Sequence, residues 1–130
     1  MTARQKIEGL TNAWYGYVTF SALASLFRDG LPGVFSILLA AFGLGLSLAL
    51  TWFIGRRLLA KSALTRFILL CVTLIGSVGG AFGVAKATWL FVQTWQLGLL
   101  GVVFFGGVSV YMHTKSFRTL TDASVRAYFN

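Results

Sequence analysis

The chain has 130 residues, of which 57% are hydrophobic and only 11% are charged. A water-soluble domain of this size needs far more polar surface, because its outside must face water. The composition therefore argues against a soluble globular protein and predicts that its solvent is mostly lipid. In lipid, each backbone N–H and C=O must be paired within its own segment, so we expect an all-α fold.

Basic residues outnumber acidic ones by 11 to 3, which gives a formal charge of +8. In a soluble protein this imbalance would suggest nucleic acid as a partner. Here the basic residues lie between apolar runs rather than along one face, which is typical of chains oriented in a membrane. We predict contact with the lipid bilayer and its anionic headgroups, and no nucleic-acid partner.

Four apolar segments follow one another along the chain. A span needs about 20 residues, at about 1.5 Å of rise each, to cross a hydrocarbon layer of roughly 30 Å. Residues 10–27 are the weakest candidate, because several polar side chains interrupt them. Residues 33–54 and 67–91 are unambiguous, and residues 96–112 are short but almost purely apolar. We predict a single domain, residues 1–112, that is an integral membrane bundle of four transmembrane helices.

Turn-forming residues separate the first two segments. Residues 28–33 form a compact stop and restart, in which Gly30 suits the end of one helix and Pro32 suits the first turn of the next. The first and second segments are therefore predicted to form a tight antiparallel hairpin.

A basic loop is predicted between the second and third segments, from Gly55 to Arg66. It has no acid, and the positive-inside rule places it on the cytoplasmic side. Its topology-determining residues are Arg56, Arg57, Lys61 and Arg66. With four spans and the N-terminus inside, that side collects nine of the eleven basic residues, leaving only Arg28 and Lys86 outside. Both termini are thus predicted to be cytoplasmic, most simply at a bacterial inner membrane.

An interfacial helix is the alternative for residues 10–27, since Trp14, Tyr15 and Tyr17 would suit a headgroup layer. Three spans would then remain, and the tail from His113 onward would lie outside. The basic residues of that tail would oppose the charge bias, which favours the four-span arrangement.

The tail, residues 113–130, is polar enough to be cytoplasmic. Thr121 or Asp122 suits the cap of a short amphipathic helix within it. Such a helix would present an apolar edge made of Val125, Tyr128 and Phe129. We expect this edge to anchor the tail at the membrane interface, with docking to a partner as the alternative.

Ionisable groups that could carry chemistry are scarce. The three acids, Glu8, Asp29 and Asp122, lie outside the predicted spans, which argues against a proton- or sodium-coupled pump. The single cysteine, Cys71, and the single histidine, His113, are too few to form a metal site. The sequence therefore predicts no enzyme activity, no catalytic residue, no metal and no cofactor.

Lys86 is the one charge inside an apolar run. Because an unpaired charge in lipid is costly, Lys86 could line a pore or contact a partner. The simpler interpretation is that it lies near the outer end of the third span and extends its ammonium group to the interface.

Small residues recur at helical spacing and predict close helix packing. They remove side-chain bulk from one stripe of a helix, so that another helix can approach. The second segment contributes Ala41, Gly45 and Ala49, and the third contributes Gly76, Gly79, Gly80, Gly83 and Ala87. These rows can pack the helices of one chain, but small residues nearly encircle the third segment. The surplus predicts assembly with other copies of the chain or with other membrane subunits.

The layout resembles the ATP synthase I chain, a small four-span protein encoded beside bacterial ATP synthase subunits that assists rotor assembly. The resemblance rests on span order, the tight first hairpin, the basic central loop and a lysine late in the third span; the polar residues expected around that span are missing. We predict a small non-enzymatic membrane subunit that acts by helix packing, as a homo-oligomer or as an accessory component of a larger inner-membrane complex. The alternative is a small oligomeric channel or a holin-like pore-forming protein with a glycine-lined conduit.

Overall fold

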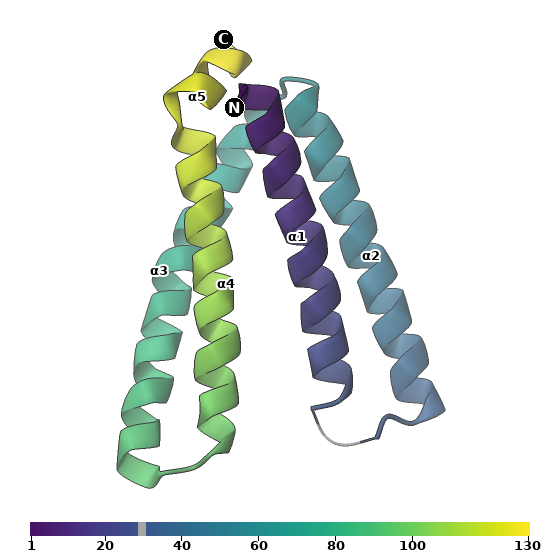
Figure 1. Ribbon diagram of the computed structural model, residues 1–130, viewed down its shortest axis with the longest axis vertical. Coiled ribbons are helices and arrows are strands. Elements are labelled where there is room, and N and C mark those ends of the chain that lie inside the picture. Colours follow the sequence, from purple (N-terminus) through teal and green to yellow (C-terminus); the bar gives the residue numbers. More distant parts are fainter. Residues whose placement is uncertain (29–30) are drawn as a thin grey trace.

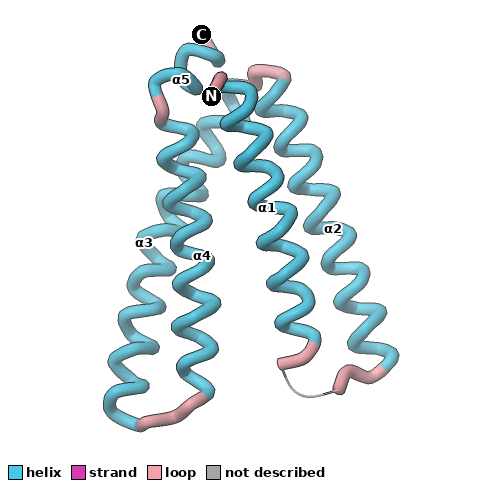
Figure 2. The backbone as a smooth tube through the Cα atoms, viewed as in Figure 1, coloured by secondary structure: helices cyan, strands magenta, loops and turns pink. Residues whose placement is uncertain are grey.

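The computed structural model describes residues 1–28 and 31–130, and within these ranges every regular element is a helix. Four long helices and one short one follow in the order α1 (Ala3–Leu26), α2 (Val34–Leu59), α3 (Ala63–Thr94), α4 (Gly98–Thr121) and α5 (Ala123–Phe129). Figure 2 shows that the connections between the helices are short. The all-α prediction is confirmed for the described residues. The helix end predicted at Gly30 lies outside them.

Side-chain caps fix where several helices begin. Thr2 caps α1 in a reciprocal arrangement with Gln5, in which each side chain bonds the other residue's backbone N–H. Ser62 accepts a hydrogen bond from the backbone N–H of Thr65 at the start of α3. Asp122 accepts one from the backbone N–H of Ser124 at the start of α5. These caps satisfy N–H groups that have no partner within the helix.

The loop predicted from Gly55 to Arg66 is wrong. Helix α2 continues to Leu59 and α3 begins at Ala63, so that only residues 60–62 connect them. Basic side chains are favourable in the last turn of a helix, where the backbone carbonyls carry partial negative charge, and Arg56 and Arg57 occupy that turn of α2. The charges that end the apolar run therefore do not end the helix.

The C-terminal region is likewise more helical than a free tail. Helix α4 runs past His113 to Thr121, and α5 follows directly after the capping residue Asp122. Residues 113–130 are thus a continuation of α4 and a second helix packed on the rest of the chain.

The long helices form two hairpins. Helix α1 packs along α2, and α3 packs along α4, whereas the contacts between the two pairs are few. Figure 1 shows that the pairs converge at the end that holds both termini, α5 and the α2–α3 connection, which we call the closed end. They diverge towards the opposite end, which we call the open end.

The hydrophobic core lies at the closed end rather than along the middle of the molecule. It is formed by the buried side chains Ile7, Leu10, Leu58, Leu120 and Val125. These residues come from α1, α2, α4 and α5, so this cluster joins the two hairpins.

Elsewhere the large apolar side chains point outward. Phe35, Phe42 and Phe82 are 77%, 73% and 74% exposed. Helices α2 and α3 are long and apolar enough to cross a membrane, and almost none of their most apolar stretches is buried. These two helices therefore differ from the core helices of a soluble protein, and their outer surfaces suit lipid.

Glycine allows α3 and α4 to approach each other closely. A Cβ atom on Gly76 would lie 2.7 Å from Nδ1 of His113, and one on Gly80 would lie 2.7 Å from a methyl group of Val110. In the opposite direction, a Cβ atom on Gly106 would lie 2.7 Å from a methyl group of Val84. The two helices are therefore packed at a distance that larger residues at these positions would prevent.

Substitution of alanine for Gly76 should destabilise the α3–α4 hairpin by about 1–3 kcal/mol, because the new methyl group overlaps the imidazole ring. Gly107→Ala is the matched control, since a Cβ atom there meets nothing within 4 Å. The control should be neutral or stabilising by up to about 1 kcal/mol, because alanine favours a helix more than glycine does. Thermal unfolding in detergent, followed by tryptophan fluorescence, measures both; equal midpoints for the two variants would contradict the packing described above.

Candidate functional site

An ion pair between the chain ends fastens the closed end. Nζ of Lys6 donates hydrogen bonds to Oδ1 of Asp122, at 2.8 Å, and to Oγ of Ser124, at 3.0 Å. The ammonium group of Lys6, followed by the side chain and backbone N–H of Ser124, holds the pKa of Asp122 well below its usual range. The pair joins the start of α1 to the junction of α4 and α5.

Basic residues of the α2–α3 region hold the other side of α5. Tyr128 donates its hydroxyl hydrogen to the backbone carbonyl of Leu59 at 2.8 Å, and Nζ of Lys61 lies 4.9 Å from the centre of the Tyr128 ring. Nε of Arg66 donates to the carbonyl of Leu120 at 3.1 Å, and its guanidinium carbon lies 5.5 Å from the centre of the Phe129 ring. Two residues predicted only to set topology, Lys61 and Arg66, therefore also bind the C-terminal helix.

Three further basic residues lie over aromatic rings of the preceding helical turn. Arg56 lies over Trp52 at 4.9 Å, Arg57 over Phe53 at 5.3 Å and Lys115 over Tyr111 at 6.0 Å, measured to the ring centres. A Lys or Arg over an aromatic ring is held by the negative charge of the ring face. The closed end therefore brings basic and aromatic side chains together.

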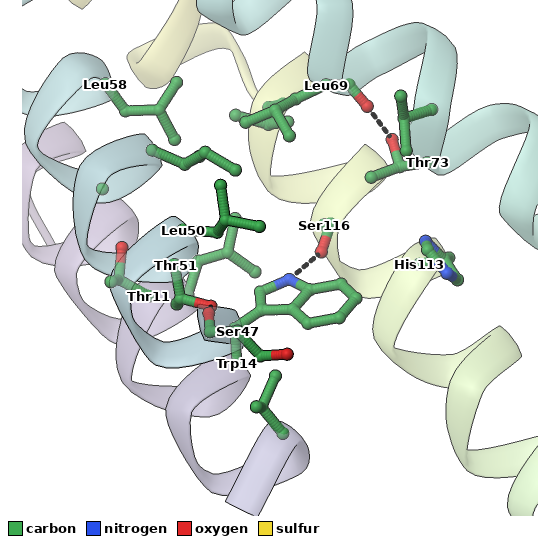
Figure 3. Close-up of a pocket in the computed structure, with 16 residues that line it drawn as sticks. Thr11, Trp14, Ser47, Leu50, Thr51, Leu58, Leu69, Thr73, His113 and Ser116 are labelled. Atoms are coloured by element: carbon green, nitrogen blue, oxygen red, sulfur yellow. Dashed lines mark hydrogen bonds between the residues drawn. The ribbon is translucent and has the colours of Figure 1, made fainter. Parts of the chain in front are cut away.

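A cavity of about 300 Å³ lies beside the closed-end core, lined by residues of all four long helices (Figure 3). Most of its lining is hydrocarbon. Nε1 of Trp14 donates a hydrogen bond to Oγ of Ser116 at 2.8 Å, and Ser116 in turn donates to the carbonyl of Met112 at 2.7 Å. Thr73 donates to the carbonyl of Leu69 at 2.7 Å. The polar groups of Trp14, Ser116 and Thr73 thus bond within the chain.

His113 is half-buried at the edge of this cavity. Its ring lies flat on Gly76 and meets the ring of Trp14 edge-on, with centroids 5.4 Å apart. Its Nδ1 atom is buried and has no hydrogen-bond partner in the part of the chain that the structure describes. No carboxylate or thiol lines the cavity with it, so the lining residues described do not include an acid–base pair. The contacts of His113 with Gly76 and Trp14 therefore indicate a packing role.

Among the described residues, no three His, Cys, Asp or Glu side chains are grouped so that they could hold a metal ion. Cys71 is exposed on α3 and does not line the cavity that His113 lines.

Lys86 is exposed on α3, about two turns before the helix ends at Thr94. It lies 20 residues after Arg66, which is about 30 Å along the helix axis and matches the thickness of a hydrocarbon layer. This spacing is consistent with one basic residue at each interface. A role for Lys86 in a pore or a partner contact stays a prediction.

The small residues predicted for packing are divided between internal and outward positions. Gly76 and Gly80 contact α4, and Ala87 is buried. Gly79 and Gly83 have open space where a Cβ would be. The predicted row on α2, Ala41, Gly45 and Ala49, is exposed. Helix α1 instead approaches another face of α2, where Gly55 accommodates the side chain of Thr11, and sequence spacing alone did not distinguish these faces.

Comparison with protein-family models, with curated proteins and with solved structures gives no match. The similarity of layout to the ATP synthase I chain therefore gains no support, and any function must be argued from the geometry.

Breaking the ion pair of the closed end should release α5. Lys6→Ala and Asp122→Asn remove an interaction between residues 116 positions apart, whereas Glu8→Gln removes the exposed Arg4–Glu8 pair within α1 and serves as the control. We expect faster hydrogen–deuterium exchange of the α5 amides in the first two variants only. Equal exchange in all three would show that the apolar contacts of Val125 hold α5 without the ion pair.

In the unsubstituted chain, the protection of the α5 amides from hydrogen–deuterium exchange should decrease at low pH only. Because the folded-state pKa of Asp122 is depressed, its stabilisation is fully present above the unfolded-state pKa, about 3.9, and is lost as pH falls below that value. Protection of α5 should therefore stay constant from about pH 8 to about pH 5 and decrease as the pH falls below about 4.

Proposed function

We propose that this protein is a small non-enzymatic membrane subunit that acts by helix packing, with four spanning helices and both termini cytoplasmic. It works as a homo-oligomer or as an accessory component of a larger inner-membrane complex. The distribution of apolar side chains supports the proposal. The packed core occupies only the closed end, and elsewhere along the helices the large apolar side chains point outward.

The hairpin arrangement supports four spans. Helices α2 and α3 could each cross a membrane, and α1 and α4 pack along them. Each of α1 and α4 has 24 residues, or about 36 Å, which is enough to cross beside its neighbour. A helix lying flat on the membrane surface would cross α2 at a steep angle, whereas α1 runs alongside it (Figure 1).

Charge at the closed end supports cytoplasmic termini. This end holds α5, both termini and the α2–α3 connection with its flanking basic residues. Of its acids, Glu8 pairs with Arg4 and Asp122 pairs with Lys6, so most of the basic residues there keep an unpaired charge. An excess of Lys and Arg favours the cytoplasmic side.

Unfilled helix surfaces support a packing role. Gly45, Gly79 and Gly83 leave room for a neighbouring helix that the chain does not itself supply. In lipid, helices associate through such close contacts rather than through exclusion of water.

Cysteine labelling tests the topology. In a Cys71→Ser background, Lys61→Cys should react with a membrane-impermeant thiol reagent only in inside-out vesicles, and Gln96→Cys, at the open end, only in right-side-out vesicles. Labelling of Lys61→Cys from the outside would overturn the proposed orientation, and labelling of both from one side would overturn the single crossing by α3 between them.

Native mass spectrometry in mild detergent tests the packing role. The particle is expected to exceed the 14.1 kDa of one chain, as a multiple of that mass or as a complex with other subunits. A chain that remains monomeric at every concentration, and alone after extraction from its native membrane, would contradict the proposal.

A further inference from the structure

Three hollows between the helices share lining residues. The cavity beside the closed-end core shares Val18 and Ser47 with a hollow of about 300 Å³ between α1 and α2. That hollow shares Ser21 and Ser25 with a third, of about 600 Å³, between α1 and α4. We call these three hollows together the inner cleft.

The inner cleft differs in composition from the outer faces of the helices. Towards the open end its walls carry the small residues Ser21, Ala24, Ser25, Gly98, Gly101 and Gly106, together with the larger side chains of Arg28, Val102 and Phe105. The outer faces carry bulky side chains, represented by the exposed phenylalanines described above. Bulky hydrocarbon suits lipid, whereas small and hydroxyl-bearing residues are enriched where one helix contacts another.

Space at the glycines of the cleft is not filled by the chain itself. A Cβ atom on Gly43, Gly98 or Gly101 would meet nothing within 4 Å. On the α3–α4 contact, by comparison, a Cβ atom on Gly76 or Gly80 would overlap a neighbouring side chain. The cleft therefore has room for a neighbouring helix at these glycines.

The surface of the whole chain, its lipid-facing sides included, sets an upper limit on the area that a second copy could cover. The chain exposes 8680 Å². A compact chain of 14.1 kDa would expose about 6,700 Å², so about 2,000 Å² per chain is in excess. Two chains that covered this excess would bury about 4,000 Å² in total, which is within the range of permanent dimers.

We propose that a second copy of this chain packs into the inner cleft, so that α1 and α4 of each copy, through Ser21, Ser25, Gly98 and Gly101, contact the other copy. The inference rests on the proposed function and specifies its partner and its surface. Since both copies have the same orientation in the membrane, a two-fold axis along the membrane normal relates them, and the same patch is used on both.

A lipid chain fits the cleft less well than a helix does. The open Cβ positions of Gly98 and Gly101 allow a helix to approach closely, which a lipid chain does not need. The hydroxyl of Ser25 donates to the carbonyl of Ala22 at 2.9 Å, so it can face a neighbouring helix without a new partner.

Gly101→Leu tests the interface without disturbing the monomer, because the position has free space in the chain. Gly107→Leu is the matched control: it lies on the same helix, also has free space, and does not line the cleft. By native mass spectrometry across a detergent dilution series, Gly101→Leu should lower the dimer association constant about tenfold or more, and Gly107→Leu should leave it unchanged. Equal dimer fractions for the two variants would overturn the cleft interface while leaving assembly itself in place.

Disulfide cross-linking in native membranes identifies the occupant. In the Cys71→Ser background, Ser25→Cys should form a covalent dimer on mild oxidation, and Leu38→Cys, 64% exposed on α2 and outside the cleft, should not. A product of any other mass would assign the cleft to a different protein and overturn the proposal. If no cross-linked product forms but the wild-type chain still forms larger particles, the cleft interface is rejected and the proposed function is not. If no product forms and the wild-type chain is a monomer by itself, the proposed function is rejected as well.

Discussion

Burial of hydrocarbon stabilises a fold strongly only where the alternative environment is water. In this chain the completely buried side chains Ile7, Leu120 and Val125 gather at the closed end, together with most of the basic residues. On the proposed membrane placement, that end reaches the cytoplasm, and it is the part of the molecule where the hydrophobic effect operates. Between the membrane surfaces, helix contact depends on close fit instead. This difference explains why the hairpins join at the closed end and separate elsewhere.

The basic residues of the closed end combine two functions because their contacts mostly leave the charge intact. Arg66 bonds a backbone carbonyl and lies over an aromatic ring, and Lys61 lies over Tyr128; neither contact uses an acid. The same side chains can therefore hold α5 in place and still supply the positive charge that orients a membrane protein and attracts anionic headgroups. Only Arg4 and Lys6 form ion pairs within the described residues.

Hydropathy predicted the existence and order of the four long helices because each contains a long apolar run. It placed their ends poorly, since the apolar run of α2 stops near Arg56 while favourable helix-end electrostatics carry the helix to Leu59. The sequence also indicated a capped helix with an apolar edge at Val125. Its partner could not be predicted, because the ion pair that positions it joins Lys6 to Asp122, and no local pattern links residues 116 positions apart.

Small-residue spacing identified helices suited to close packing but not the face that is used. On α2, Ala41 and Gly45 satisfy the spacing and remain exposed, while Gly55 receives the side chain of Thr11. Spacing alone does not show which face of α2 is used, because that depends on the position of the neighbouring helix.

Glycine in a helix costs about 1 kcal/mol relative to alanine, so its use needs a compensating contact. At Gly55, Gly76, Gly80 and Gly106 the contact is present, because a side chain from a neighbouring helix lies within 3 Å of where a Cβ atom would be. At Gly79 and Gly101 the same cost is incurred and the chain provides no such contact. A close contact with a helix from outside the chain would offset that cost. A lipid tail gains little from the loss of a methyl group, whereas a helix gains close approach, and this asymmetry is the physical reason to regard the chain as a subunit.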